Sequence, residues 1–134
     1  NNACNTTITE TLNVLIEQAN IPPVAHAGPD LTLKKNTEYC VSFLKTGFED
    51  WMCGGVQFAP EHSALGTGSY DPDGTINNYA IAYDKGNPQV LIHHNNFGTA
   101  IINYTTSGTK TLELCVTDNN NATNCDNASV TVTE

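Results

Sequence analysis

Short runs of alternating apolar and polar residues restrict the fold of this 134-residue chain more than any other feature. Successive side chains of a β-strand point to opposite faces of a sheet, so each run predicts a half-buried strand. The clearest run, residues 109–117 (TKTLELCVT), places three apolar side chains on one face: Leu112, Leu114 and Val116. Several such runs separated by turns, with no long helix, predict an all-β fold, a two-sheet β-sandwich.

Turn residues divide the chain into further expected strands. Residues 69–74 (SYDPDG) predict a turn, because Pro72 fixes φ and Gly74 accepts positive φ. A second turn is expected at 118–121. The other expected strands are residues 31–33, 39–43, 76–83, 90–92, 100–104 and 128–133, preceded by an edge strand within 20–29. Between residues 44 and 65 the alternation stops, and a folded insert containing Phe48, Trp51 and Phe58 is expected there.

Residues 1–19 are expected to form an N-terminal extension ahead of one domain at 20–134. Two patterns fit residues 9–19 (TETLNVLIEQA). As a strand, Leu12, Val14 and Ile16 share one face, whereas as a helix the stripe is Leu12, Leu15, Ile16 and Ala19. The β-branched residues and the Pro22-Pro23 pair that follows favour the strand. Such an apolar face needs a partner, either the chain's own domain or a neighbouring subunit.

The charge balance excludes two classes of partner. Fourteen acidic residues against five lysines and no arginine leave a formal net charge of −9. Nucleic acids and anionic membrane surfaces bind cationic patches, so neither is an expected partner. No run approaches the roughly 18 apolar residues of a membrane-spanning helix, so membrane insertion is not expected either.

Five cysteines predict disulfides and therefore an oxidising, extracellular location: Cys4, Cys40, Cys53, Cys115 and Cys125. A three-residue turn at 119–121 would place Cys115 opposite Cys125, and these two are expected to pair. Cys40 and Cys53 are expected to close the base of the insert. Cys4 then remains free or bonds another subunit, although pairing of Cys4 with Cys40 or Cys53 is the competing arrangement.

Four Asn-x-Ser/Thr sequences permit N-glycosylation in a host with the required enzymes, at Asn5, Asn103, Asn121 and Asn127. No nucleophile motif, zinc-protease motif or phosphate-binding loop is present, so the sequence predicts a protein that is not an enzyme. His93 and His94 are adjacent on an expected strand and point to opposite faces, so they are not expected to chelate one metal together.

Three stretches resemble the polycystic kidney disease (PKD) family of immunoglobulin-like domains, in order and in spacing. Residues 20–30 (NIPPVAHAGPD) resemble its first strand, residues 68–86 (GSYDPDGTINNYAIAYDKG) its Asp-Pro-Asp-Gly turn and the next strand, and residues 104–132 its last hairpin. The sequence departs from the family in the insert, at Ile81 in place of the usual Trp, and at Asp84-Lys85-Gly86 in place of Gly-Asp-Gly. The resemblance implies a seven-stranded, two-sheet sandwich and a non-catalytic extracellular module that serves in adhesion, as a spacer or in surface layers.

The same resemblance implies a Ca²⁺ site, because some family members bind Ca²⁺ near the first strand and at the Asp-Pro-Asp-Gly turn. By position, the ligands here would be Asn20, Asp71 and Asp73. Ca²⁺ takes six to eight oxygen ligands, which clustered aspartates on turns supply. The alternative is that Asp71 and Asp73 only stabilise the turn through local backbone N–H groups.

Two functional hypotheses remain. Residues 11–23 (TLNVLIEQANIPP) resemble the junction in tandem PKD arrays, yet residues 128–134 already supply a last strand. The extra strand, with Leu12, Val14 and Ile16, could therefore pair with another copy by β-augmentation, and repetition would give a filament. The alternative is a carbohydrate-binding, adhesion or spacer module of a larger secreted enzyme, with a polysaccharide partner and residues 1–19 as the end of an upstream domain.

Overall fold

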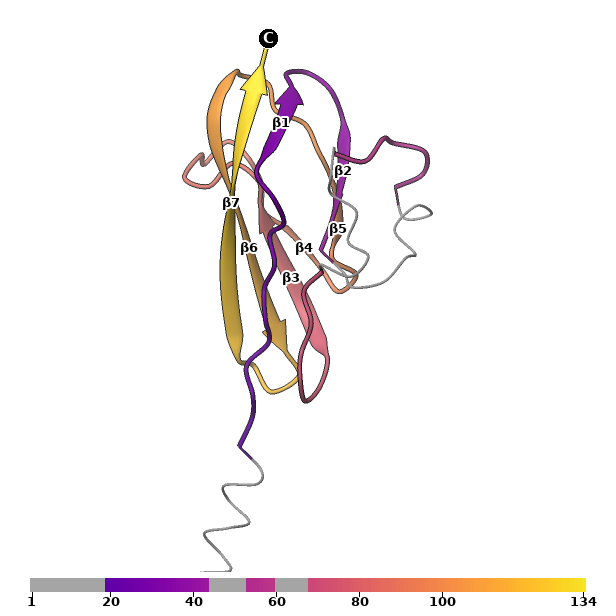
Figure 1. Ribbon diagram of the computed structural model, residues 1–134, viewed down its shortest axis with the longest axis vertical. Coiled ribbons are helices and arrows are strands. Elements are labelled where there is room, and N and C mark those ends of the chain that lie inside the picture. Colours follow the sequence, from indigo (N-terminus) through magenta and orange to yellow (C-terminus); the bar gives the residue numbers. More distant parts are fainter. Residues whose placement is uncertain (1–18, 44–52, 60–67) are drawn as a thin grey trace, which may run out of the picture.

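The computed structural model of the chain describes residues 19–43, 53–59 and 68–134, which form strands and no helix (Figure 1). The all-β sandwich expected from the sequence is therefore confirmed. The Cys4, Asn5, Leu12, Val14 and Ile16 predictions and most of the insert lie outside the described residues. The strands are β1 (Leu31–Lys34), β2 (Tyr39–Ser42), β3 (Ile76–Ala82), β4 (His93–Asn95), β5 (Thr99–Ile102), β6 (Gly108–Asp118) and β7 (Thr123–Thr133).

The larger sheet has five strands in the order β1-β7-β6-β3-β4, and the smaller sheet pairs β2 with β5. Within the larger sheet, β1 runs parallel to β7, with Leu31 opposite Val130. The β6–β7 hairpin is the longest pairing and extends from Gly108 opposite Val132 to Thr117 opposite Thr123. The first and last strands of the domain therefore lie side by side (Figure 1).

The core lies between the two sheets; the strands of the larger sheet supply it by alternation, whereas all four residues of β2 are buried. On β6 the apolar side chains of Leu112, Leu114 and Val116 are fully buried, while the residues between them face outward. Each buried side chain of this size contributes about 1.5–3 kcal/mol relative to an exposed one. The other strands contribute Leu31, Leu33, Val41, Tyr79, Ile81, Ala100, Ile102, Ala128, Val130 and Val132.

Tyrosine side chains pack within or against this core. The Tyr104 hydroxyl donates a 2.7 Å hydrogen bond to the carbonyl of Tyr83, and the two rings meet edge to face at 5.2 Å. Burial raises the pKa of Tyr104 well above its ordinary value and that of Tyr79 to about 12. The Tyr79 ring lies against Gly98, where a Cβ would approach within 3.0 Å and φ is +66°, so only glycine fits there.

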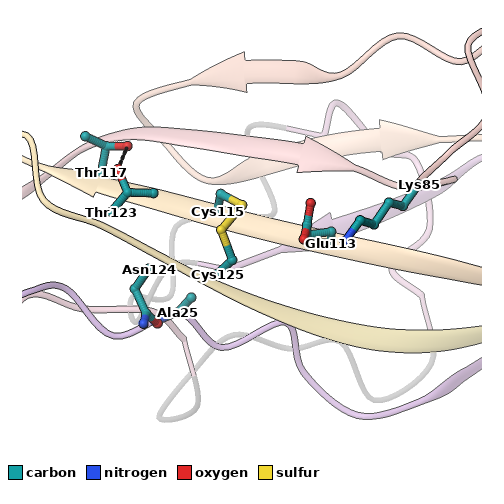
Figure 2. Close-up of a disulfide and its surroundings, with 8 residues drawn as sticks. All are labelled: Ala25, Lys85, Glu113, Cys115, Thr117, Thr123, Asn124 and Cys125. Carbon is teal, nitrogen blue, oxygen red and sulfur yellow. Dashed lines mark hydrogen bonds and ion pairs between the residues drawn. A yellow bond between two sulfur atoms is a disulfide. The ribbon is translucent and has the colours of Figure 1, made fainter.

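Two disulfides join the pairs of cysteines that the sequence predicts. Cys115 and Cys125 lie directly opposite each other on β6 and β7, with Cα atoms 4.1 Å apart (Figure 2). Their neighbours on the same outer face are the Thr117–Thr123 hydroxyl pair and the Glu113–Lys85 ion pair (Figure 2). Cys40 and Cys53, 6.1 Å apart at Cα, attach the start of the described part of the insert to β2.

The strand predicted at residues 90–92 is wrong, because β4 begins only at His93. Asn87 holds the preceding chain in a turn: its side-chain oxygen accepts a bond from the Gln89 N–H and its carbonyl accepts one from the Val90 N–H. The last strand begins at Thr123 instead of residue 128, because hairpin pairing continues through polar residues. In the segment expected to form an edge strand, the pairing is a single bridge between Val24 and Tyr70.

Side chains on β7 satisfy the backbone of this first segment. The N–H groups of Ala25 and Ala27 donate to the side chains of Asn124 and Asp126, at 3.1 and 2.9 Å (Figure 2 shows the first pair). The His26 N–H donates to the Ser69 hydroxyl at 2.9 Å, on the opposite side of the segment. Residues 24–27 therefore connect β7 with residues 69–70, and the chain enters β1 beyond them.

Candidate functional site

One end of the sandwich brings three carboxylates together. Asp71 and Asp73 belong to the turn before β3, and Asp118 ends β6. Because β3 and β6 are antiparallel neighbours, with Ile76 opposite Asp118, the start of one strand lies beside the end of the other. One oxygen from each of the three side chains lies within 4.8 Å of the others. These three residues are called the acidic cluster below.

Asp118 is fully buried, and its carboxylate accepts three hydrogen bonds. Oδ2 receives the Asn20 side-chain amide at 2.7 Å, and Oδ1 receives the backbone N–H groups of Asn120 and Ala122 at 2.9 and 2.8 Å. These bonds, that of Asn20 first, hold the pKa of Asp118 below its ordinary value against the opposing effect of burial. Asp118 is therefore a carboxylate that organises the turn after β6.

Asn20 and Ile21 attach the start of the domain to the same end. The Asn20 side-chain oxygen accepts a 2.8 Å bond from the Asn120 amide, and the Ile21 N–H donates to Asp73 Oδ2 at 2.9 Å. Both polar atoms of the Asn20 side chain are thus used within the protein. Asn20 therefore lies at this end of the sandwich, and its side chain holds Asp118 and the turn after β6 in place.

Asp71 is the unusual member of the acidic cluster. Its Oδ2 atom is buried and has no hydrogen-bond partner among the described residues, while Oδ1 accepts a long 3.5 Å bond from the Asp73 N–H. Burial, followed by the neighbouring carboxylates, raises the pKa of Asp71. A Cβ at position 74 would lie 2.9 Å from this oxygen and would collide with the side-chain oxygen of Asn119. Glycine at this position therefore provides the room that the Asp71 and Asn119 side chains need.

This donor set suits a hard divalent cation, because it offers carboxylate oxygens and one of them is buried without a donor. The structure places Asp71 and Asp73 together and bonds Asn20 to the third carboxylate, that of Asp118, which sequence reasoning missed. Only the observed pairing of β3 with β6 shows that the end of β6 lies beside the Asp-Pro-Asp-Gly turn. Asp30, the aspartate directly before β1, is outside the acidic cluster, and its carboxylate accepts a hydrogen bond from the Ser129 N–H.

A second surface feature is an open depression of about 620 Å³ between the β3–β4 loop and β6. Leu91 and Ile92 on its wall are 82% and 52% exposed, the highest values among the large apolar side chains of the described residues. Its polar wall carries an ion pair of 2.8 Å between Lys85 and Glu113. Contiguous exposed apolar side chains beside polar walls are typical of a binding surface.

The remaining predicted site residues are spread over the surface. Asn103, Asn121 and Asn127 are exposed, as glycosylation would require. His93 packs against the Tyr83 ring at 5.8 Å, whereas His94 lines the depression, so the two do not share a ligand. The exposed rings of His26 and Tyr70 stack at 6.1 Å.

No protein-family model matches the chain, and a comparison with curated proteins finds no match either. A solved structure from a study of promiscuous carbohydrate-binding modules of the β-sandwich superfamily is similar, with 21% identity and a TM-score of 0.54 over 87% of this chain. This chain spans 36% of the length of that structure. Two PKD domains are also similar: the PKD1 domain of Vibrio anguillarum Epp (30% identity, TM-score 0.39, 48% of this chain and 69% of that chain) and that of the KIAA 1837 protein (19%, 0.49, 87% and 92%).

The class is therefore that of the two-sheet β-sandwich modules, with a fold shared with a carbohydrate-binding module structure. Within that class, the Asp-Pro-Asp-Gly turn, the strand after it and the final hairpin make this chain a PKD-like domain of the immunoglobulin type. The two disulfides fit an oxidising compartment. The described residues contain no helix that is long and apolar enough to cross a membrane.

Proposed function

We propose that this chain is a non-catalytic extracellular module that assembles with copies of itself by donating its N-terminal extension, residues 1–19, to a neighbour. The observation that carries the proposal is the pairing of β1 with β7, in which the chain supplies its own last strand to the sheet. The extension is then a surplus segment, and its strand pattern would expose Leu12, Val14 and Ile16. Burying these side chains would contribute on the order of 5 kcal/mol before ordering costs.

The test uses the full-length chain with Cys4→Ser, so that only non-covalent contacts are measured. Sedimentation velocity over a concentration series is expected to show polymers for this protein and monomers for the triple variant Leu12→Ser, Val14→Ser, Ile16→Ser. Leu15→Ser is the matched control, because Leu15 lies on the other face of the proposed strand. A parent protein that stays monomeric, or a triple variant that still polymerises, would contradict strand donation.

A second candidate function is polysaccharide binding, which the fold shared with a carbohydrate-binding module structure favours. His26 and Tyr70 are both exposed and their rings stack, so an aromatic face is available on which a sugar ring could lie. Affinity electrophoresis with a panel of polysaccharides would detect retardation that Tyr70→Ala removes and Phe97→Ala retains, since the Phe97 ring is equally exposed at 39%. No retardation by any polysaccharide would count against this function.

A third proposal, compatible with either function, is that the acidic cluster binds Ca²⁺ and stiffens the end from which the extension leaves. It is supported by the buried, undonated Oδ2 of Asp71 and by the proximity of the three carboxylates. Ca²⁺ is expected to raise the melting temperature relative to chelator, and Asp71→Asn with Asp73→Asn is expected to abolish this rise. Glu38→Gln, which removes an exposed carboxylate outside the cluster, is expected to retain it. An undiminished rise in the double variant would place the ion elsewhere.

A further inference from the structure

We propose that the acceptor for the N-terminal extension of a second copy is the outer edge of β4 together with the depression beside it. This inference rests on the proposed self-assembly and names the surface that receives the donated strand. The occupant is residues 9–19 of the neighbouring copy, added as a strand along β4. Leu12, Val14 and Ile16 would then face the apolar wall formed by Leu91 and Ile92.

The outer edge of β4 is open to strand addition. β4 ends the larger sheet and pairs only with β3, so its other edge faces no strand among the described residues. Natural proteins usually protect such edges with lysine, proline or an inward-pointing charge. Residues 90–97 (VLIHHNNF) contain no lysine, proline or acidic residue. The edge therefore carries none of these residues, although β4 is itself only three residues long.

Apolar exposure distinguishes this edge from the others. Leu91 and Ile92, directly before β4, are 82% and 52% exposed, whereas Ile101 on β5 is 38% exposed. β1, at the opposite edge of the larger sheet, ends in Lys34 and is followed by Lys35. β2 in the smaller sheet is bridged along Cys40 by Phe58 of the insert. An apolar strand therefore gains most contact with previously exposed apolar surface at β4.

The charges around the depression are closer to balance than the net charge of the whole chain. The extension carries Glu10 and Glu17 and no basic residue, and the whole chain carries a net charge of −9. Around the depression, Lys85 pairs with Glu113 at 2.8 Å and Lys110 lies 4.0 Å from Asp84, so two positive charges balance two negative ones. The extension would thus meet little of the repulsion that most of this surface presents.

The positions of donor and acceptor determine the form of the assembly. Asn20, the residue after the extension, is bonded to Asp118 at the end of β6. At the depression, the Lys85 N–H donates to the carbonyl of Thr111, which is also on β6. Seven residues of β6 separate these points, about 24 Å along a strand. In Figure 1 the first described residues lie at the end of the sandwich opposite the C-terminus, while the β3–β4 loop lies towards the C-terminal end. A contact between opposite ends leaves a free donor and a free acceptor on every dimer, so it propagates head to tail.

Complementation between two full-length variants tests this inference, again with Cys4→Ser in both. The donor variant, in which the donor strand is disabled, carries Leu12→Ser, Val14→Ser and Ile16→Ser and keeps an intact acceptor. The acceptor variant, in which the acceptor surface is disabled, carries Leu91→Glu and keeps an intact donor. Because Leu91 is largely exposed, this substitution should not prevent folding. Each variant alone is expected to remain monomeric, with association weakened about 100-fold or more, and their mixture is expected to give dimers that do not extend. Ile101→Glu adds the same charge on the smaller sheet and is expected to polymerise like the parent protein.

The outcomes separate this inference from the proposal on which it rests. If the donor variant is monomeric but Leu91→Glu and Ile92→Glu both polymerise normally, strand donation stands and the acceptor lies elsewhere. If both variants are monomeric but their mixture forms no dimer, the β4 edge is likewise not the acceptor of this segment. If the parent protein never associates, both the self-assembly and its acceptor are overturned.

Discussion

Asp118 joins the start of the domain to the turn after β6 through one buried carboxylate. Its hydrogen bonds reach Asn20 at the start of the domain and the backbone of Asn120 and Ala122 in the turn after β6. A buried carboxylate is tolerated when donors replace the lost water, and these donors favour its charged form. The residue therefore stabilises the end of the sandwich from which the extension leaves.

Asp118→Asn is expected to lower the free energy of unfolding, measured by urea denaturation in chelator. The donors hold the pKa of Asp118 in the folded protein below its unfolded value of about 3.9. Its contribution is thus fully present above that unfolded value and is lost as pH falls through the lower folded pKa. The difference in unfolding free energy between the parent protein and the Asp118→Asn variant should shrink below about pH 4. A difference that is constant with pH would show that charge at Asp118 is not the cause.

Tyr104→Phe is expected to cost about 1–2 kcal/mol of unfolding free energy, because it leaves the Tyr83 carbonyl without its donor. Tyr83→Phe is the comparison variant, since it changes the adjacent ring but keeps that hydrogen bond. Chemical denaturation of both proteins measures the difference. Equal stability of the two variants would mean that water replaces the Tyr104 hydroxyl without loss.

The β6–β7 hairpin shows how one element carries two kinds of stabilisation. Its inner face supplies Leu112, Leu114 and Val116 to the core, and its outer face carries the Cys115–Cys125 disulfide (Figure 2). The disulfide links residues that the hairpin register already places opposite each other. The fold should therefore depend more on the inner face than on the cross-link.

Removing the disulfide with Cys115→Ala and Cys125→Ala is expected to cost about 3 kcal/mol or less, because the closed loop is short. Leu114→Ala is expected to cost about 2–5 kcal/mol, because it opens a cavity in a fully buried position. Thermal and urea denaturation of the two variants, with circular dichroism to confirm β structure, tests the comparison. A cysteine variant that no longer folds would show that the cross-link is required for the hairpin to form.

At the scale of the whole molecule, net charge opposes the proposed self-assembly. Copies with a charge of −9 repel one another, while the proposed contact is apolar and locally balanced in charge. Added salt shortens the screening length from about 30 Å at 0.01 M to about 8 Å at 0.15 M. Screening should therefore remove repulsion without weakening the contact.

Assembly is accordingly expected to increase with ionic strength over this range, and also as pH approaches the isoelectric point near 4.6. Sedimentation velocity of the Cys4→Ser protein in a salt series measures this dependence. Polymers that dissociate on adding salt would indicate an interface held by ion pairs, which the Leu91 and Ile92 surface does not provide.

Local pattern was sufficient for much of this fold. Alternation along β6 predicted which of its side chains are buried, and the symmetry of Cys115 and Cys125 about the turn predicted their pairing, because both depend on neighbours close in sequence. Pro72 and Gly74 likewise marked their turn, although Gly74 does not adopt the positive φ that it could accept there. The Asn20, Asp71 and Asp73 set followed from a family resemblance; the structure places Asp71 beside Asp73 and bonds Asn20 to Asp118, the third carboxylate.

Tertiary structure decided what depends on contacts between distant residues. The pairing of β3 with β6 brings Asp118 to Asp71 and Asp73, and no spacing in the sequence encodes that approach. The apolar run at residues 90–92 has the composition of a buried strand, yet the turn at Asn87 leaves Leu91 in solvent and starts β4 only at His93. Composition determines which side chains favour burial, but the register of neighbouring strands and the turns between them determine which of these side chains are covered.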